Sequence, residues 1–458
     1  MYYIVVMDNT TQYNIKSDSI DRFVEAYIGN PFDDDIKKSK ILVEKNVRRW
    51  FDEGLDIIIE KVIRRGYREY EKFMLALHTY IAVSRNKIIF KRQSPKLIHE
   101  RYKGGLIIKD FKNIGETSEK VFNYLNRSIV GSSRAIIEVK KTTWFACFGI
   151  DLTIALYNKG LIRDNNVLII GETGTGKELF AQTLLTSDMG GDNYSKGESI
   201  DINLASFPKD IVSSELFGSE KGAFTGAINK KGKLTSAHNG SIFLDEIGEI
   251  PIETQIGLLR AIETKKVLRL GGEKFEDAEV RYISATNKNI SNPDNFRSDL
   301  YQRIAGISIY IPPLRERRED IVEIGDFWRK KERGLKTSFI EEDKRNLTSF
   351  LKELQDLDHD WPGNVRELKR QVDNKRMGLN TILDENKKMN ISLSQSSEKP
   401  PTEYSIKSIE QVGYTLKELT DRYICHAVQK TGKNISQAAK LLDIDRTTVN
   451  RRYNKNNG

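Results

Sequence analysis

The sequence predicts an α/β protein built on a parallel sheet, with a helical lid and an all-α module near the C-terminus. Three observations predict this fold class. Residues from about 129 to 375 alternate short apolar runs with helical segments, as in a parallel sheet with crossover helices. The stretch NVLIIGETGTGKE has the form of a strand, a glycine-rich loop and a helix start. From Ile406 onward the chain is helical and basic, with ten Lys and Arg against five Asp and Glu.

The composition is that of a soluble globular protein, with room for about three domains. The 458 residues are 38% hydrophobic and 30% charged, and the net charge of +9 favours an anionic partner without identifying it. The most apolar run, residues 144–157, contains Asp151 and is shorter than the ~20 residues that span a bilayer; we expect a packed helix there. With no visible export signal and two distant cysteines, we expect a cytoplasmic protein without a membrane partner.

Changes in composition divide the chain into five segments. The first, residues 1–128, combines a strand-like start at residues 3–7 with long helical periodicity. We expect an α/β or α+β sensory or regulatory domain of unidentified fold. The other segments are an α/β core at 129–311, a helical lid at 312–375, a polar linker at 376–405 and a helix-turn-helix at 406–458.

The glycine-rich loop predicts a site for the phosphates of ATP. Glycines let the backbone curl so that N–H groups converge on phosphate, and the helix beginning at Lys177 directs its positive end there. The next position, where a hydroxyl would normally bind Mg²⁺, holds Glu178, and the loop motif alone is weak. The predicted cofactor-binding residues of this loop are Gly171, Glu172, Thr173, Gly174, Thr175, Gly176, Lys177 and Glu178.

Two further apolar runs end in polar residues that suit the same site. GSIFLDEIGE ends in Asp245, which we expect to hold Mg²⁺, and Glu246, which would polarise the attacking water. YISATN ends in Asn287, which would orient the water or the γ-phosphate. The alternative for the acidic pair is an ordinary buried strand followed by a solvated turn.

Three arginines complete the expected ATPase site. Arg297 and Arg303 would supply charge in trans to a neighbouring protomer's γ-phosphate, and Arg366, in WPGNVREL, would sense nucleotide from the lid. For each arginine taken alone, the alternative is a surface salt bridge.

These motifs, in this order, resemble the AAA+ domain of bacterial enhancer-binding proteins, the activators of sigma-54 RNA polymerase. The resemblance runs from IVGSSRAIIEVKK at Ile129 to WPGNVREL at Leu368 and includes the C-terminal module, roughly two thirds of the chain. In this family the residue after the loop lysine is usually Glu, as at Glu178. The resemblance implies that Asn203, in DINLAS, holds Glu246 until the nucleotide state changes; the alternative is a turn-capping Asn.

The most specific motif is GAFTGA, which places one large aromatic among five small residues. Neither a core strand nor a helix is spaced by glycines in this way. The resemblance implies a loop inserted in a helix of the AAA+ core that contacts sigma-54, with Phe224 as its exposed probe. The expected sigma-54 contact residues are Gly222, Ala223, Phe224, Thr225, Gly226 and Ala227.

The C-terminal stretch TGKNISQAAKLLDIDRTTVNRRY has the form of a helix-turn-helix and resembles the Fis-type DNA-binding domain. Its first helix would pack through a face that includes Ala438, Ala439 and Leu441, and Val449 would fix the second. The alternative is a basic helical tail for protein contacts. The expected DNA-binding residues are Ser436, Gln437, Arg446, Thr447, Thr448, Asn450, Arg451 and Arg452.

The function implied is an ATP-dependent activator that binds double-stranded DNA upstream of promoters. Its ring, expected to be a hexamer, would remodel the sigma-54 RNA polymerase holoenzyme. The alternative is a DNA-binding regulator whose AAA+ domain serves oligomerisation or remodelling without sigma-54. Many members of the family begin with a phosphoreceiver, but here only Asp8 follows the first strand-like run, so we expect a ligand- or protein-sensing region instead.

Overall fold

The computed structural model contains two compact units, Met1–Thr381 and Ile382–Gly458. In the first unit the structure describes residues 17–36, 38, 58, 61–62, 64–65, 67–84, 108–188, 197–292, 295–331 and 340–381. In the second it describes residues 382–384, 423–424, 427–428, 431, 434–442 and 444–457.

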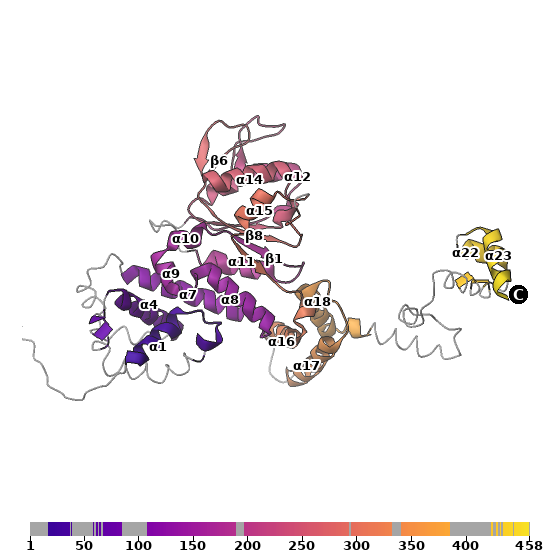
Figure 1. The fold of residues 1–458 in the computed structure, drawn as a ribbon, viewed down its shortest axis with the longest axis horizontal. Coiled ribbons are helices and arrows are strands. Elements are labelled where there is room, and N and C mark those ends of the chain that lie inside the picture. The colour runs from indigo at the N-terminus through magenta and orange to yellow at the C-terminus, as the bar shows by residue number, and fades with distance from the viewer. Residues whose placement is uncertain are drawn as a thin grey trace, which may run out of the picture. The chain divides into compact units, whose positions relative to one another are not determined.

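A five-stranded parallel sheet forms the centre of the first unit (Figure 1), which confirms the predicted fold class. The strand order is β2-β5-β8-β1-β9, and each neighbouring pair is parallel. Strand β2 was not predicted, because at the edge of the sheet it buries only alternate residues and has no continuous apolar run. The strands are β1 Val167–Ile170, β2 Ile200–Asn203, β5 Ser241–Asp245, β8 Arg281–Thr286 and β9 Ile307–Tyr310.

Different helices cover the two faces of the sheet (Figure 1). Val167 and Ile169 of β1 join a hydrophobic cluster with α8 and α11, whereas Leu168 points to a second cluster with α12, α14 and α15. This alternation within one strand shows that both faces are buried, as expected for a sheet with crossover helices. The helices are α8 Arg134–Phe148, α11 Lys177–Thr186, α12 Lys209–Phe217, α14 Ile252–Thr264 and α15 Ser298–Ile304.

Three N-terminal helices extend the first cluster: α1 (Ser17–Ile28), α4 (Tyr67–Ser84) and α7 (Ile108–Arg127). The described residues before 128 form helices and turns. The strand expected at residues 3–7 lies outside the described residues, so the expected α/β or α+β character of this domain stays a prediction. Helix α7 packs against α11 and against α9 (Leu152–Tyr157). The N-terminal helices and the sheet therefore share one hydrophobic core.

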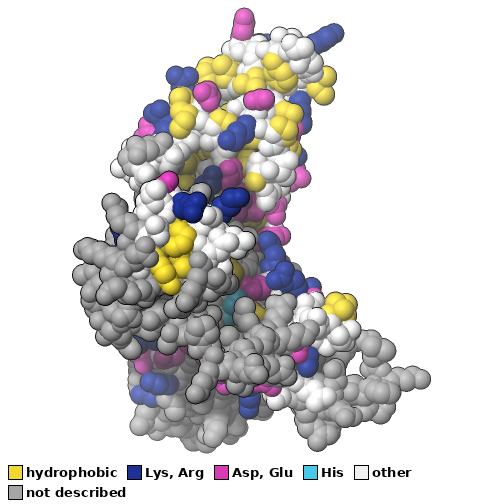
Figure 2. Space-filling model, turned by 90° about the vertical axis from the view of Figure 1, so that its right-hand side faces the viewer, with side chains coloured by type: hydrophobic (Ala, Val, Ile, Leu, Met, Phe, Trp, Pro, Cys, Tyr) yellow, Lys and Arg dark blue, Asp and Glu magenta, His cyan; other side chains and the backbone are white. Residues whose placement is uncertain are grey.

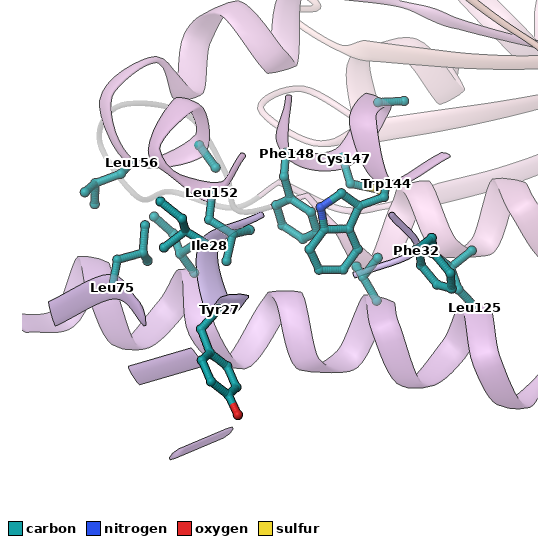
Figure 3. Close-up of a cluster of buried hydrophobic side chains, with 14 of the residues drawn as sticks. Tyr27, Ile28, Phe32, Leu75, Leu125, Trp144, Cys147, Phe148, Leu152 and Leu156 are labelled. Carbon is teal, nitrogen blue, oxygen red and sulfur yellow. The ribbon is translucent and has the colours of Figure 1, made fainter. Parts of the chain in front are cut away.

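The apolar run at residues 144–157 packs against the N-terminal helices (Figure 3). It forms the end of α8 and all of α9. The Trp144 ring packs at an angle against those of Phe148 and Phe32, with centroids 4.7 and 6.4 Å away. Asp151 caps α9 by accepting the Thr153 N–H at 2.8 Å. The expectation of a packed helix is confirmed. Within the described residues, no helix is long and apolar enough to cross a membrane.

Two short hairpins project from the sheet beside α12 and α14. Strands β3 (Gly218–Ser219) and β4 (Lys230–Lys231) pair antiparallel, and so do β6 (Lys266–Leu268) and β7 (Phe275–Asp277). Residues 222–227 lie in the segment 220–229 that connects β3 to β4. The remaining short elements of this unit are α10 Lys159–Asp164, η1 Leu204–Ser206, α13 Lys233–Ser236 and η2 Ile247–Glu249.

After β9 the chain forms a helical lid, as the sequence predicts. Leu351 and Leu354 of its central helix are buried, and so is Trp361 in the following turn. Two single turns, η3 and η4, lead from the sheet into the lid. The elements are η3 Leu314–Glu316, η4 Arg318–Asp320, α16 Ile321–Lys331, α17 Ile340–Asp356 and α18 Asn364–Arg376.

The second unit contains α22 (Ile435–Leu442) and α23 (Arg446–Asn457). Ala438, Ala439 and Val449 lie in its small core, as predicted, but Leu441 is 59% exposed. Leu441 lies off the packed face of α22, which is formed by Ile435, Ala438, Ala439 and Leu442. Most of the linker expected at 376–405 lies outside the described residues.

Candidate functional site

The glycine-rich loop connects β1 to α11 at the carboxyl edge of the sheet, where α/β proteins place their ligands. Gly174 and Gly176 have φ values of +81° and +102°, which residues with side chains rarely adopt. At Gly174 a Cβ atom would also lie 2.4 Å from the carbonyl oxygen of Gly363. Glycine here permits both the turn of the loop and the close approach of the lid.

Lys177 begins α11 with its ammonium group turned back over the loop. Its Nζ donates to the carbonyl oxygens of Gly171 at 3.0 Å and Glu172 at 3.3 Å, and lies 3.9 Å from Glu246 Oε1. Burial lowers the pKa of Lys177, and the carboxylates of Glu246 and Asp245 oppose that effect. A partly desolvated cation held beside converging N–H groups suits a polyphosphate.

Asp245 and Glu246 follow each other but turn in different directions. Asn203 Nδ2 donates to Asp245 Oδ2 at 3.0 Å, because β2 and β5 pair in register with Asn203 opposite Asp245. The expected contact of Asn203 with Glu246 is therefore replaced by one with Asp245. Glu246 has a left-handed backbone, φ +55°, which turns it toward Lys177.

Asn287 follows β8, as predicted, and joins the loop to Glu246. Its Nδ2 donates to Thr173 Oγ1 at 2.9 Å, and its main-chain N–H hydrogen-bonds to Glu246. Burial nevertheless raises the pKa of Glu246 above its ordinary value, with Lys177 opposing the shift. A carboxylate with a raised pKa at the end of a strand is a suitable general base.

Two other residues of the predicted set have different surroundings. Glu178 is exposed on the first turn of α11. The Glu172 carboxylate contacts the lid: it accepts from Arg315 at 2.6 and 2.9 Å and from Asn364 Nδ2 at 3.1 Å. These hydrogen bonds hold the pKa of Glu172 below its usual range. Because the lid engages the Glu172 side chain, the backbone of the loop is what remains available to phosphate at this position.

Sequence reasoning missed Arg315, Arg317 and Asn364, which all contact the loop from the lid side. Asn364 has φ +50° and is fully buried. The dense charges of PPLRERRED were visible in the sequence, but nothing in the pattern indicated which of them turn inward.

The three predicted arginines lie at exposed or half-exposed positions. Arg297 pairs with Asp299 at 2.7 Å and Arg303 with Glu263 at 3.1 Å. Arg366 is exposed near the start of α18, and its Cβ lies close to Gly174. The structure brings Arg366 to the phosphate loop, while Arg297 and Arg303 make ion pairs with carboxylates of their own chain.

The loop at residues 222–227, the Phe224 loop, is exposed to solvent. Gly222 and Gly226 have φ values of +92° and +85°, and a Cβ on either would meet nothing within 4 Å. Phe224 is 45% exposed, and Ile228 is 68% exposed beside it. Hydrophobic side chains are interspersed with charged ones at this end of the molecule, at the level of β6 and α12 (Figure 2). The loop presents an aromatic side chain to solvent.

The β6–β7 hairpin supports the base of this loop. Glu220 N–H donates to the Leu270 carbonyl at 3.0 Å, and Leu270 N–H donates to that of Gly218 at 3.0 Å. Gly271, with φ +72°, leaves room for Ala223. The loop thus has a fixed base and an exposed tip.

The sequence of the chain matches the family described as Sigma-54 interaction domain over residues 150–310, which contain the phosphate loop, Asp245, Glu246 and the Phe224 loop. It is 32% identical over 396 residues to the Transcriptional activator RocR of Bacillus subtilis, covering 82% of this chain and 77% of RocR. The chain belongs to the family of sigma-54-dependent transcriptional activators.

Other relatives are covered over a smaller share of their length than RocR. This activator is 36% identical to the Signal-transduction and transcriptional-control protein of Clostridium beijerinckii, covering 75% of the activator and 51% of that protein. With the Transcriptional regulatory protein ZraR of Salmonella typhimurium the identity is 35%, covering 62% of each. The activator thus spans between about half and three quarters of these relatives. Among solved structures, NtrX from Brucella abortus in complex with ATP is 23% identical, with a TM-score of 0.42 over 77% of this chain and 76% of that one.

The C-terminal unit of the activator exposes most of the predicted DNA-binding residues. Ser436, Gln437, Arg446, Thr447 and Asn450 are exposed, and Thr448 and Arg452 are half-buried. Thr447 N–H donates to Asp445 Oδ1 at 2.7 Å, which fixes the start of α23. The side chain of Arg451 lies outside the described residues.

Asp245 is the residue of this activator that fits a magnesium site. Within the described residues there is no group of three or more His, Cys, Asp or Glu that could hold a metal. Mg²⁺ in nucleotide sites needs only one or two carboxylates, because phosphates and water supply the other ligands. Asp245, half-buried at the end of β5 beside Lys177 and Glu246, meets that requirement.

Proposed function

We propose that this activator binds and hydrolyses ATP and uses the cycle to remodel the sigma-54 RNA polymerase holoenzyme, acting from DNA upstream of the promoter. One observation carries the proposal. Lys177, Glu246 and Asn287 meet around one phosphate loop, while Phe224 stands on a separate glycine-flanked loop in the same domain. A site for hydrolysis and an exposed aromatic contact are what a motor acting on another protein needs.

The residues divide the chemistry among them. Lys177 binds phosphate oxygens, and the backbone N–H groups of the loop bind the others. Glu246, oriented by the Asn287 N–H and by Lys177, accepts the proton of the attacking water. Mg²⁺ held by Asp245 would neutralise charge on the phosphates. Asn203 ties β2 to Asp245, so movement at the metal-binding carboxylate reaches the edge of the sheet.

We further infer that the protein acts as a ring, in which Arg297 and Arg303 reach the γ-phosphate of a neighbouring protomer. Both arginines are exposed enough to exchange their present carboxylate partners, since exposed ion pairs contribute only ~0–1 kcal/mol. A hexamer is the arrangement we propose. The C-terminal unit would deliver the ring to DNA through the exposed side chains of α22 and α23.

The test measures ATP hydrolysis by the full chain against protein concentration, beside transcription from a sigma-54 promoter. Activity per protomer should rise as rings form. Lys177→Ala should abolish nucleotide binding, and mixing it with Arg303→Ala should restore part of the activity, because each chain supplies what the other lacks. Rates independent of concentration would contradict the ring. Hydrolysis without any effect on sigma-54 transcription would favour a regulator whose AAA+ domain serves oligomerisation.

A further inference from the structure

The carbonyl oxygens of the phosphate loop are all engaged by hydrogen-bond donors. Lys177, on the loop's own helix, binds those of Gly171 and Glu172. The next three are bound from the lid. The lid contacts are Asn364 Nδ2 to the Thr173 oxygen at 3.1 Å, Val365 N–H to the Gly174 oxygen at 3.0 Å, and Arg317 Nη2 to the Thr175 oxygen at 3.1 Å.

These contacts determine where the loop's N–H groups point. All described peptide bonds are trans, and in a trans peptide unit the N–H points opposite to the carbonyl. Holding the Thr173 and Thr175 carbonyls toward the lid turns the N–H groups of Gly174 and Gly176 away from it. An anion site in a glycine loop is made by such turned-out N–H groups. The lid therefore orients the donors that a phosphate would meet.

Both polar atoms of the Asn364 side chain are hydrogen-bonded. Its side chain is buried, its Oδ1 accepts the Leu314 N–H at 2.7 Å, and its Nδ2 donates to Thr173 and to Glu172 Oε2. Arg315 donates to both oxygens of the Glu172 carboxylate. The left-handed backbone of Asn364, φ +50°, is one that Asn tolerates better than most residues.

Arg317 is buried where a charged side chain is energetically unfavourable. It is 2% exposed, and its Nε has no hydrogen-bond partner among the described residues. The charge of the neighbouring Asp320 partly offsets the burial of Arg317, but Asp320 takes its hydrogen bonds from other donors. It accepts the N–H groups of Ser132 and Ser133 and the Ser133 hydroxyl at 2.7–2.9 Å. Burying an arginine with an unsatisfied nitrogen is costly, and the hydrogen bond that Arg317 makes from this position goes to the Thr175 carbonyl of the loop.

We propose that Arg317 and Asn364 are positioning residues of the nucleotide site, which orient the peptide units of the phosphate loop from the lid. Nucleotide affinity then depends on how the lid is seated, in addition to any direct contact that Arg366 makes. The inference rests on the proposed function, because it assigns the loop to nucleotide phosphates.

The test titrates the full chain with a fluorescent N-methylanthraniloyl derivative of ADP and measures the thermal melting of the nucleotide-free protein. Arg317→Met should weaken nucleotide binding ~10-fold or more, as expected for loss of a charge-assisted contact that orients the site. It should change Tm little, because the cost of burying the guanidinium is removed while Asp320 keeps its three hydrogen-bond donors. The matched control is Arg318→Met. Arg318 donates to the lid carbonyls of Leu357 and His359 and pairs with Asp358 at 3.9 Å, all within the lid, so its loss should spare nucleotide affinity.

Asn364→Gly removes the side chain and allows the left-handed backbone. It tests the proposed positioning role if Arg317→Met does not fold. It too should bind the probe ~10-fold more weakly. Wild-type affinity in a folded Arg317→Met or Asn364→Gly protein would overturn the proposal, and so would an equal loss in Arg318→Met. A wild-type chain that fails to bind the probe would refute the proposed function instead.

Discussion

The phosphate loop and the Phe224 loop are both short and glycine-rich, but their glycines serve opposite purposes. At Gly174 an added Cβ would lie 2.4 Å from the Gly363 carbonyl oxygen of the lid, and at Gly171 it would lie 3.1 Å from the Ile311 carbonyl oxygen. At Gly222 and Gly226 it would meet nothing within 4 Å. In the first loop glycine permits close approach, and in the second it permits conformations open to a partner. The same composition thus builds one rigid site and one exposed tip.

The largest effect should come from the chemistry beside the rigid loop. Glu246→Gln removes the carboxylate that accepts a proton from water, so kcat should fall ~10²–10⁴-fold. Nucleotide affinity should stay within a few fold, because Lys177 and the loop backbone remain. Steady-state hydrolysis and a nucleotide titration measure the two quantities. Equal loss of binding and hydrolysis would mean that Glu246 shapes the loop instead.

Two phenylalanines test the difference in burial. Phe243 is 1% exposed in β5, so Phe243→Ala should lower the free energy of unfolding by ~3–5 kcal/mol. Phe224→Ala should change it by no more than ~0.5 kcal/mol and spare ATP hydrolysis. It should abolish sigma-54-dependent transcription, because the contact loses its aromatic anchor. Thermal melts beside both activity assays separate these results. A Phe224→Ala protein that melts early and loses every activity would make Phe224 a core residue.

Substituting one glycine in each loop compares the two loops directly. Gly174→Ala should push the lid off the loop and weaken nucleotide binding ~10-fold, since a Cβ there collides with backbone. Gly222→Ala should leave binding within twofold, although φ +92° makes alanine strained there, and should reduce transcription alone. The nucleotide titration and the transcription assay provide the readouts. Equal effects of the two substitutions on nucleotide binding would break the distinction between the loops.

The smallest effect is on pH dependence. Burial raises the pKa of Glu246, which must be deprotonated to act, so kcat/KM should fall with decreasing pH from above the ~4.3 of free Glu. Burial lowers the pKa of Lys177, which must be protonated to bind phosphate, so the alkaline limb should begin below ~10.4. Phe224→Ala should show the same pH profile. An acid limb at or below the range of free Glu would contradict the role of Glu246.

Much of this fold could be predicted, because its signals are local. Continuous apolar runs marked four of the five sheet strands, and short motifs marked Lys177, Glu246 and Asn287. The edge strand β2 lacked such a run, and the partner of Asn203 depended on its register with β5.

The rest depended on contacts between distant residues. Arg315 meets Glu172 across 143 residues, and no local pattern shows that a lid arginine turns back onto the loop. The apolar run at 144–157 indicated a packed helix, but not that the N-terminal helices would cover it. Such contacts arise only when separate elements assemble, so single-sequence patterns do not contain them.

The burial of Trp144, Phe148 and Leu152 limits where this protein can be divided. These side chains belong to the segment that begins at residue 129, but they are buried with Phe32 and Leu125, which precede it. A chain cut at residue 129 would expose them to water and promote aggregation. Replacing residues 1–128 with another domain would require a new surface of the same shape. The boundary between the two segments therefore lies inside a shared hydrophobic core, so a substitution on one side of it constrains the packing on the other.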